Sequence, residues 1–306
     1  MDRRDFVKSS SLAAAGVLGT PILSSKLGEQ STKPTSAPSQ ELKIKMAVKF
    51  GMVQGPKTVL ARFELLKKLG FDGVEVGRPA KTPLKELIAA STATGLPIHG
   101  VVDSDHWNNR FSDPRPEIRK KAVAALEGAI RDAKTLGASS VLVVPGVVDQ
   151  SVRYDECYQR SQTEIRKVLP LATELNIKIA FENVWNNFLL SPLEAARYCD
   201  EFESPLVGFY FDVGNVIRYG WPEHWIHALG HRIFKLDVKE YSRKKQFDEG
   251  PWKGFKVKIG DGDCNWPGVR KALKAIGYSG WATAEVGGSG EERLADIKAR
   301  MDRALG

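Results

Sequence analysis

The chain has 306 residues, of which 42% are hydrophobic and 27% charged, a composition typical of a folded protein with a sizeable core and not of a disordered one. Its three cysteines include no CxxC pair, so neither a disulfide framework nor a cysteine-rich zinc site is implied. The formal net charge is +8, but the basic clusters are short and interleaved with acidic residues, which disfavours nucleic acid as a partner. A basic balance also suits small anionic ligands.

Residues 1–30 resemble a twin-arginine export signal. Arg3 and Arg4 precede a short, mildly apolar stretch from Ser11 to Gly19, which is the order of elements in such signals. This stretch is shorter than the about 20 apolar residues that span a bilayer, so we expect no stable membrane anchor. We predict an exported, periplasmic protein whose cleavage position is unassigned. The alternative is a basic terminus without a targeting role.

Residues 31–41 are rich in Pro, Ser and Thr, as in flexible linkers, and the predicted folded domain spans residues 42–306. In this domain short runs of β-forming residues alternate with amphipathic helical stretches, the pattern of a parallel sheet covered by helices. Eight such units over about 265 residues predict an α/β fold, a (β/α)8 TIM barrel. No GxGxxG motif follows the first run, which disfavours a dinucleotide-binding fold. The predicted strands are 44–50, 73–76, 98–102, 140–144, 177–181, 207–211, 233–238 and 281–286.

The helical stretches carry apolar residues at the spacing of an amphipathic helix. One example comprises Ala122, Ala125, Leu126, Ala129 and Ile130. Three of the stretches end at a glycine, at positions 70, 137 and 277. Glycine there predicts a left-handed C-cap before the next strand.

Four predicted strands end in a carboxylate, namely Glu182, Asp212, Asp237 and Glu285. Active sites of parallel barrels lie at the carboxyl ends of the strands, so we expect these side chains to meet. Four ionised carboxylates in one low-dielectric site repel one another, and one divalent ion would relieve this repulsion. All-oxygen ligation favours Mn2+ or Mg2+ over zinc. The alternative for any single acid is a helix N-cap or a surface ion pair. Glu75, which closes the second strand, either lines the same pocket or pairs with a nearby lysine.

Strand alternation predicts the neighbours of Asp237. If Asp237 faces the barrel axis, Lys235 and Lys239 lie on the same side of the strand, whereas Phe234 faces the helices. We expect Lys239 and Arg243 to offset the residual negative charge of the site.

Four stretches at the strand ends carry a recognisable pattern. They are residues 181–188 (FENVWNNF), 211–215 (FDVGN), 260–263 (GDGD) with Trp266-Pro267, and 280–285 (GWATAE). The pattern resembles the sugar phosphate isomerase and epimerase family with the xylose isomerase-like barrel, which includes tagatose-type ketose epimerases and hydroxypyruvate isomerase. The resemblance implies a metal held by Glu, Asp, His and Glu in chain order, which places Glu182, Asp212 and Glu285. Many members have His-x-Lys-Asp at the third position, whereas this chain has Asp237-Val238-Lys239-Glu240. Either Asp237 substitutes for the histidine or the site has one ligand fewer.

The resemblance also implies a function, proton transfer next to a ketone through an enediolate. Glu182 and Glu285 would be the acid and base of a metal-dependent isomerase or epimerase acting on a keto-sugar or a sugar phosphate. A homo-oligomer is compatible with this function. Arg243 matches a substrate-contacting arginine of some relatives. The predicted substrate-binding residues are His99, His106, Trp107, Asn183, Trp185, Asn215, Lys239 and Arg243.

Several of the candidate side chains also have a structural interpretation. His99 and His106 either contact substrate hydroxyl groups or serve as buried histidines with satisfied hydrogen bonds. Trp185, Trp221 and Trp252 lie in loops that follow strands, where an aromatic ring either stacks on a sugar or completes the core.

Three further functions remain open. A lyase or hydratase acting on 3-keto-glycosides would use the same proton abstraction, followed by loss of a leaving group. The export signal favours it, since sugars outside the cytoplasm are usually unphosphorylated glycosides. A non-catalytic sugar-binding barrel is conceivable because the histidine ligand is replaced. An apurinic-site endonuclease needs a histidine-rich cluster of zinc ions, which five histidines mostly away from the strand ends disfavour.

Overall fold

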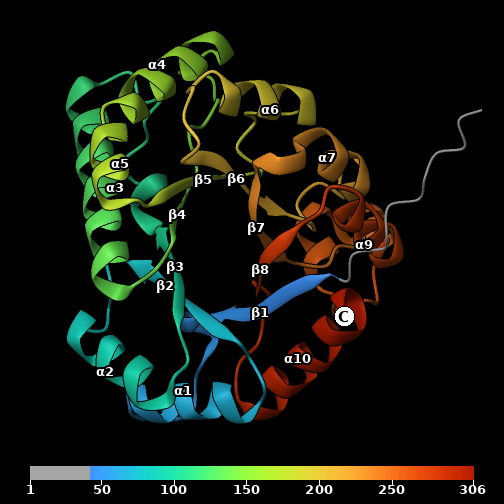
Figure 1. The fold of residues 1–306 in the computed structure, drawn as a ribbon. Coiled ribbons are helices and arrows are strands. Elements are labelled where there is room, and N and C mark those ends of the chain that lie inside the picture. Colours follow the sequence, from blue (N-terminus) through green and yellow to red (C-terminus); the bar gives the residue numbers. More distant parts are fainter. Residues whose placement is uncertain (1–41) are drawn as a thin grey trace, which may run out of the picture. The chain divides into compact units, whose positions relative to one another are not determined.

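The computed structural model describes residues 42–306, which form a closed barrel of eight parallel strands surrounded by helices (Figure 1). The strands are β1 (Lys43–Lys49), β2 (Gly73–Arg78), β3 (Ile98–Asp103), β4 (Ser140–Val143), β5 (Lys178–Glu182), β6 (Val207–Asp212), β7 (Ile233–Val238) and β8 (Ser279–Ala284). Each strand pairs with the next along the chain, and β1 pairs with β8, which closes the sheet. The predicted (β/α)8 barrel is confirmed. The predicted signal segment (1–30) and linker (31–41) lie outside the described residues.

Helices connect the strands and form an outer ring (Figure 1). The α-helices are α1 (Val59–Lys68), α2 (Leu84–Thr94), α3 (Pro116–Leu136), α4 (Tyr154–Arg166), α5 (Leu169–Leu175), α6 (Pro192–Asp200), α7 (Pro222–Leu229), α8 (Arg243–Glu249), α9 (Trp266–Ala275) and α10 (Glu291–Leu305). The 3-10 helices are η2 (Phe50–Met52), η3 (Ser104–Trp107), η4 (Gly230–Arg232) and η5 (Pro251–Phe255). Within residues 42–306, no helix combines the length and apolar character that crossing a membrane requires.

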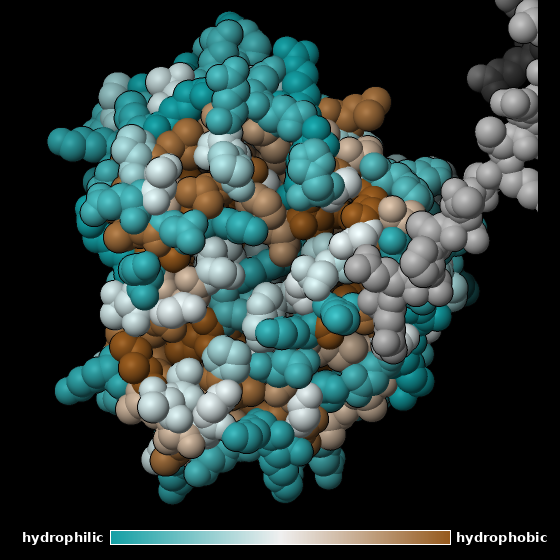
Figure 2. Space-filling view, in the orientation of Figure 1, coloured by the Kyte–Doolittle hydropathy of each residue, from teal (hydrophilic) through white to brown (hydrophobic). Residues whose placement is uncertain are grey.

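Helix α3 shows how the outer ring packs on the barrel. Its predicted apolar stripe is buried, including Ala122, Ala125, Leu126, Ala129 and Ile130. Positions three and four apart share one face of a helix, so the stripe packs on the barrel while the opposite face meets solvent. The helix is capped by Gly137 with φ of 72°, the left-handed conformation that glycine adopts without a steric penalty. In the view of Figure 2, most residues at the outline are hydrophilic, and apolar residues form separate patches between them.

The barrel interior contains a small apolar cluster below the carboxylates. Leu142, Ala180 and Tyr210 form a small inner cluster that is separate from the large core between strands and helices. Asp212 lies two residues beyond Tyr210 and therefore faces the same way. Asp212 is also the register partner of Asp237 on β7, and both carboxylates are fully buried. The strand register thus places these two carboxylates side by side, one layer beyond Tyr210.

Phe234 departs from the simple alternation along β7. Alternation predicts that Phe234 faces the helices, and this prediction is wrong, since the ring packs against the inner cluster. The register shifts between Phe209 and Tyr210, which pair with Ile233 and Lys235. Phe234 is therefore an extra residue in a β-bulge, which redirects the side chains beside it. Regular pairing resumes at Lys235.

Candidate active site

The four predicted carboxylates meet at the carboxyl ends of their strands. Glu182 ends β5, Asp212 ends β6, Asp237 is the penultimate residue of β7, and Glu285 directly follows β8. Each offers one oxygen atom, and these atoms all lie within 4.8 Å of one another. The structure therefore brings together the whole predicted set, including Asp237 at the position where histidine was expected from the resemblance.

Two asparagines orient Asp212. The side chain of Asn183 donates to the backbone oxygen of Asp212 and accepts from its backbone nitrogen, both at 2.8 Å. The backbone nitrogen of Asn215 donates to Asp212 Oδ1 at 2.8 Å. The side chain of Asn215 donates to the backbone oxygen of Asn183 at 2.9 Å. Both asparagines were predicted to bind substrate. In the structure they first fix the strand end that carries Asp212, and Asn215 also lines the pocket described below.

The ammonium group of Lys239 lies among the carboxylates. Its Nζ is 2.7 Å from Asp212 Oδ2, 2.6 Å from Glu285 Oε2 and 3.8 Å from Glu182 Oε1. Alternation along β7 predicted this neighbourhood, because Lys239 follows Asp237 by two residues. The lysine offsets part of the negative charge, as predicted from the sequence.

The surroundings of Glu182 and Glu285 move their pKa values in opposite directions. Burial raises the pKa of Glu182 to about 8, and the repulsion of Glu285 and Asp212 adds to this effect against the attraction of Lys239. Burial alone would also raise the pKa of Glu285, but the charges of Lys49 and Lys239 bring it down to about 2. Two carboxyl groups whose pKa values are pushed apart are suited to act as one acid and one base.

Lys49 at the end of β1 is a member of the site that the sequence analysis missed. Its Nζ lies 2.5 Å from Glu75 Oε2 and 3.0 Å from Asp237 Oδ2. Glu75 thus follows its predicted alternative, pairing with a lysine. Burial by itself raises the pKa of Asp237, with Lys49 opposing this shift. The buried carboxylate of Asp237 needs a compensating positive charge, and Lys49 supplies it. A neutral histidine at the same position would need no such charge. The only signal in the sequence was a lysine that follows the apolar residues Met46, Ala47 and Val48 near the end of the first predicted strand.

His99 on β3 is buried inside the barrel and makes contacts through both ring nitrogens and a ring face. Its Nδ1 is 3.0 Å from Lys235 Nζ, its Nε2 is 3.1 Å from Thr283 Oγ1, and its ring stacks on Trp281 at 4.4 Å between centroids. Burial, together with the charges of Lys235 and Lys49, lowers the pKa of His99 well below its ordinary value. The ring is therefore a neutral, hydrogen-bonded part of the barrel interior, as in the structural interpretation, while its substrate contact stays a prediction.

His106 and Trp107 belong to η3, which follows β3. His106 is buried, and its Nδ1 accepts a hydrogen bond of 3.2 Å from the backbone nitrogen of Val144. Burial lowers the pKa of His106 to about 4, so the imidazole is neutral at physiological pH. Trp107 packs edge-on against this ring at 5.2 Å and remains 46% exposed, because its other side faces the pocket.

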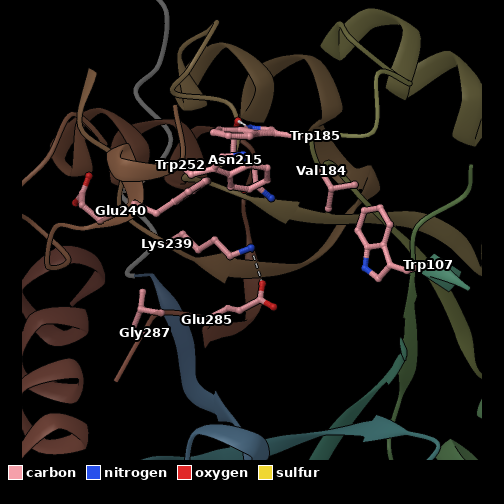
Figure 3. Close-up of a pocket in the computed structure, with 11 residues that line it drawn as sticks. Trp107, Val184, Trp185, Asn215, Lys239, Glu240, Trp252, Glu285 and Gly287 are labelled. Carbon is pink, nitrogen blue, oxygen red and sulfur yellow. Dashed lines mark hydrogen bonds and ion pairs between the residues drawn. The ribbon is translucent and has the colours of Figure 1, made fainter. Parts of the chain in front are cut away.

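A pocket of about 340 Å³ borders the carboxylate cluster at Glu285 (Figure 3). Its aromatic walls are Trp107 on one side and Trp185 with Trp252 on the other, and Lys239 and Glu285 point toward each other between them. The rings of Trp185 and Trp252 are 4.8 Å apart, and Trp252 is 69% exposed. The sequence analysis missed other lining residues, namely Val184, Glu240, Phe255, Val286 and Gly287. They lie in loops whose meeting depends on the closed barrel.

Glu240, next to Lys239, organises the loop that precedes α9. Its carboxylate accepts hydrogen bonds from the backbone nitrogen of Gly260 at 2.7 Å, from that of Cys264 at 3.0 Å and from Trp266 Nε1 at 2.8 Å. These contacts give the GDGD and Trp-Pro motif of the sequence a structural role, because the loop that contains it surrounds the buried carboxylate of Glu240. Glu240 therefore holds the pocket wall rather than joining the carboxylate cluster.

Arg243 at the start of α8 is committed to backbone carbonyl groups. It donates to the oxygen of Ile217 at 2.9 Å and to that of Gly220 at 2.7 Å, and its guanidinium lies 5.1 Å from the ring of Trp221. Neither Arg243 nor Trp221 is among the residues that line the pocket in the described part of the chain. The substrate contact predicted for Arg243 stays a prediction, and in the structure the side chain braces the loop after β6.

The carboxylate cluster fits a divalent ion. Asp237 Oδ1 is buried without a hydrogen-bond partner, whereas Asp212 Oδ2 and Glu285 Oε2 are buried in ion pairs with Lys239. Buried carboxylate charge needs such compensation. The three side chains point into one small volume shared with Glu182. A donor set made only of carboxylate oxygens suits Mg2+ or Mn2+.

Comparison with known proteins agrees with this fold. The family model described as "Xylose isomerase-like TIM barrel" matches residues 63–304. Among solved structures, the 3-keto-D-glucoside 4-epimerase YcjR from E. coli superposes with a TM-score of 0.70 at 17% sequence identity, covering 86% of this chain and 99% of that chain. This likeness is one of fold.

Two curated relatives are similar in sequence. The chain is 27% identical over 187 residues to the uncharacterized protein MJ1311 of Methanocaldococcus jannaschii, which covers 57% of this chain and 61% of that protein, less than two thirds of its length. It is 24% identical over 274 residues to the L-ribulose-5-phosphate 3-epimerase UlaE of Escherichia coli O1:K1 / APEC, which covers 80% of this chain and 90% of that protein.

Proposed function

This chain belongs to the xylose isomerase-like TIM barrel family, and we propose that it is a metal-dependent epimerase or isomerase acting on a keto-sugar. One observation carries the proposal: Glu182, Asp212, Asp237 and Glu285 offer oxygen atoms within 4.8 Å of one another, and one of the four, Glu285, lines a pocket. The name of UlaE, a sugar 3-epimerase, supports the same class of reaction.

The proposed chemistry is proton transfer at the carbon next to a ketone. A divalent ion held by the four carboxylates would polarise the carbonyl and hydroxyl oxygens of the substrate. One of Glu182 and Glu285 accepts the proton from carbon, which gives an enediolate, and the other returns a proton to it. The two glutamates come from strand ends three positions apart around the barrel. They are therefore suited to flank a substrate, and return of the proton on the opposite face yields the epimer.

The pocket favours an unphosphorylated sugar over a sugar phosphate. Lys239 is the one cationic residue that lines it within residues 42–306. Glu240 and Glu285 contribute negative charge to the same lining. Phosphate sites are usually built from arginine, lysine and helix N-termini. Aromatic faces such as those of Trp107 and Trp252 instead suit the apolar face of a neutral sugar ring.

Reaction in heavy water tests the proposal. Full-length protein loaded with Mn2+ is incubated with a panel of keto-sugars and followed by NMR. We expect an epimer or isomer to appear with deuterium at the carbon next to the carbonyl, because that position exchanges with solvent through the enediolate. Absence of both product and exchange across the panel, with the metal bound, would reject the function.

A lyase acting on 3-keto-glycosides is the second candidate. The exposed rings of Trp107 and Trp252 in the pocket lining offer an apolar surface that the leaving group of a glycoside could contact. If the export predicted from residues 1–30 holds, glycosides would be available to the protein. The same NMR experiment separates the two reactions, since elimination releases the leaving group and forms an unsaturated sugar. An epimerase keeps the glycosidic bond.

Trp252→Ala is expected to raise KM by about 5- to 10-fold with little change in kcat, because ring stacking contributes about 1 kcal/mol and acts equally before and during the reaction. The exposure of Trp252, 69%, makes loss of stability small. Trp221→Ala is the matched control, since Trp221 is 51% exposed and stands outside the pocket lining. Steady-state kinetics of both variants check this; equal KM values would remove Trp252 from the substrate site.

A further inference from the structure

Lys239 occupies the position that a divalent ion would need. Its Nζ lies 2.7 Å from Asp212 Oδ2 and 2.6 Å from Glu285 Oε2, with Glu182 Oε1 at 3.8 Å. These three residues supply three of the four oxygen donors of the candidate metal site. The ammonium group and the ion would therefore compete for the same oxygen atoms.

The two cations cannot share the cluster. An Mg2+ or Mn2+ ion lies about 2 Å from each carboxylate oxygen that it binds, which would place it against the ammonium group. Two positive charges at that separation in a partly buried site repel strongly. Binding of the ion therefore requires Lys239 to leave.

The stem of Lys239 is fixed, but its end has room to move. A Cβ atom at Gly214 would come within 2.6 Å of Lys239 Cβ. The backbone of the loop after β6 is therefore packed closely against the Cβ end of the Lys239 side chain. The far end of the side chain borders the pocket of about 340 Å³. In Figure 3 the side chain extends toward Glu285 with the tryptophan-lined space beside it. A rotation about the outer side-chain bonds suffices to carry Nζ from the carboxylates into this space.

Lys49 behaves differently, although it is also a buried lysine. It touches Glu75 and a single member of the cluster, Asp237, through Oδ2. Asp237 Oδ1 has no hydrogen-bond partner and remains available to an ion. Lys49 can thus stay in place when an ion binds.

We propose that Lys239 is a built-in counterion that holds the carboxylate cluster together without metal, and that a divalent ion displaces it into the pocket. This inference rests on the proposed function insofar as that function uses a metal. Displaced into the pocket, the ammonium group faces the substrate oxygens. Metal binding would then complete the substrate-binding surface, so that an apo protein lacks one of its polar contacts.

Calorimetric titration of chelator-treated full-length protein with MnCl2 tests the proposal. We expect Lys239→Met to bind Mn2+ with a Kd about 10- to 100-fold smaller than the unsubstituted protein, because the ion no longer has to break the ion pairs of Lys239 to enter. Lys244→Met is the matched control. It removes the same charge from a nearby side chain that is 84% exposed and paired with Asp248, and its Kd should be unchanged.

A second measurement needs no substitution, which covers the case that the variant does not fold. Trace acetylation of lysines in the unsubstituted protein is followed by peptide mass spectrometry with and without MnCl2. We expect Lys239 to react several-fold faster in the metal-loaded protein, while Lys49 reacts at the same rate in both states.

The outcomes separate this inference from the proposed function. A Kd for Lys239→Met that equals or exceeds that of the unsubstituted protein, or equal protection of Lys239 in both states, overturns the inference and leaves the function standing. If the unsubstituted protein binds neither Mn2+ nor Mg2+, the metal-dependent function falls together with it.

Discussion

Glu182→Gln and Glu285→Gln are each expected to lower kcat by about 10²- to 10⁴-fold, the range of effects measured for loss of a general acid or base. Glutamine keeps the size of the side chain but does not exchange a proton. In both variants the substrate is still bound, but a proton transfer to or from carbon has no partner. Each substitution also removes a charged oxygen donor from the cluster, so the loss should reach the upper part of this range.

The measurement is turnover of the sugar identified by NMR, with the metal content of each variant determined in parallel. Circular dichroism shows whether the barrel persists. Glu249→Gln is the matched control, because its carboxylate lies on α8 and pairs only with Lys245 at the surface. Full activity in both cluster variants would refute the acid and base assignment. The double variant should lose little more than either single one, since the two groups act in one reaction sequence.

The architecture was predictable because its signals are local. The strand runs, the helical stripe beginning at Ala122 and the glycine after Leu136 each depend on neighbours within a few residues. The carboxylates were predictable for a related reason: a closed parallel barrel brings every strand end to one mouth. Glu182 and Asp212 thus meet although 30 residues separate them in the sequence.

Other features required distances across the barrel that no local pattern contains. Lys49 pairs with Asp237, 188 residues away in the chain, and the sequence around either residue does not predict this contact. The bulge at Phe234 depends on the register between β6 and β7. Arg243 matched the spacing of a substrate-contacting residue, yet loop carbonyl groups compete for its guanidinium. Pocket walls built from loops, such as Trp107 with Trp252, are set by the loop conformations themselves.

Lys49→Met is expected to lower the free energy of unfolding by about 3–5 kcal/mol, the cost of removing one partner of a buried ion pair. The side chains of Glu75 and Asp237 are fully buried, and that of Lys49 is 13% exposed. Methionine preserves most of the volume but leaves two carboxylates without their cation. The neighbouring Glu75 Oε1 and Asp237 Oδ1 already lack hydrogen-bond partners, so the loss of Lys49 adds to an existing shortage of donors.

Urea unfolding followed by circular dichroism, in the presence of chelator, measures this effect. Lys68→Met serves as the control, because Lys68 is 70% exposed in its pair with Glu291 and such surface pairs contribute about 0–1 kcal/mol. If Lys49→Met is no more destabilised than this control, the buried pair does not support the barrel mouth.

Adding Glu75→Gln to Lys49→Met should recover part of the lost stability, because one of the two uncompensated charges disappears. Measured as a double-mutant cycle, this recovery isolates the Lys49–Glu75 coupling from the packing of the lysine stem. The remaining deficit then belongs to Asp237, the carboxylate that stands where relatives of this pattern place a neutral histidine. We thus expect the barrel mouth with its four acids to need Lys49 as a permanent cation. This need holds whether the second cation in the cluster is the ammonium group of Lys239 or a divalent ion.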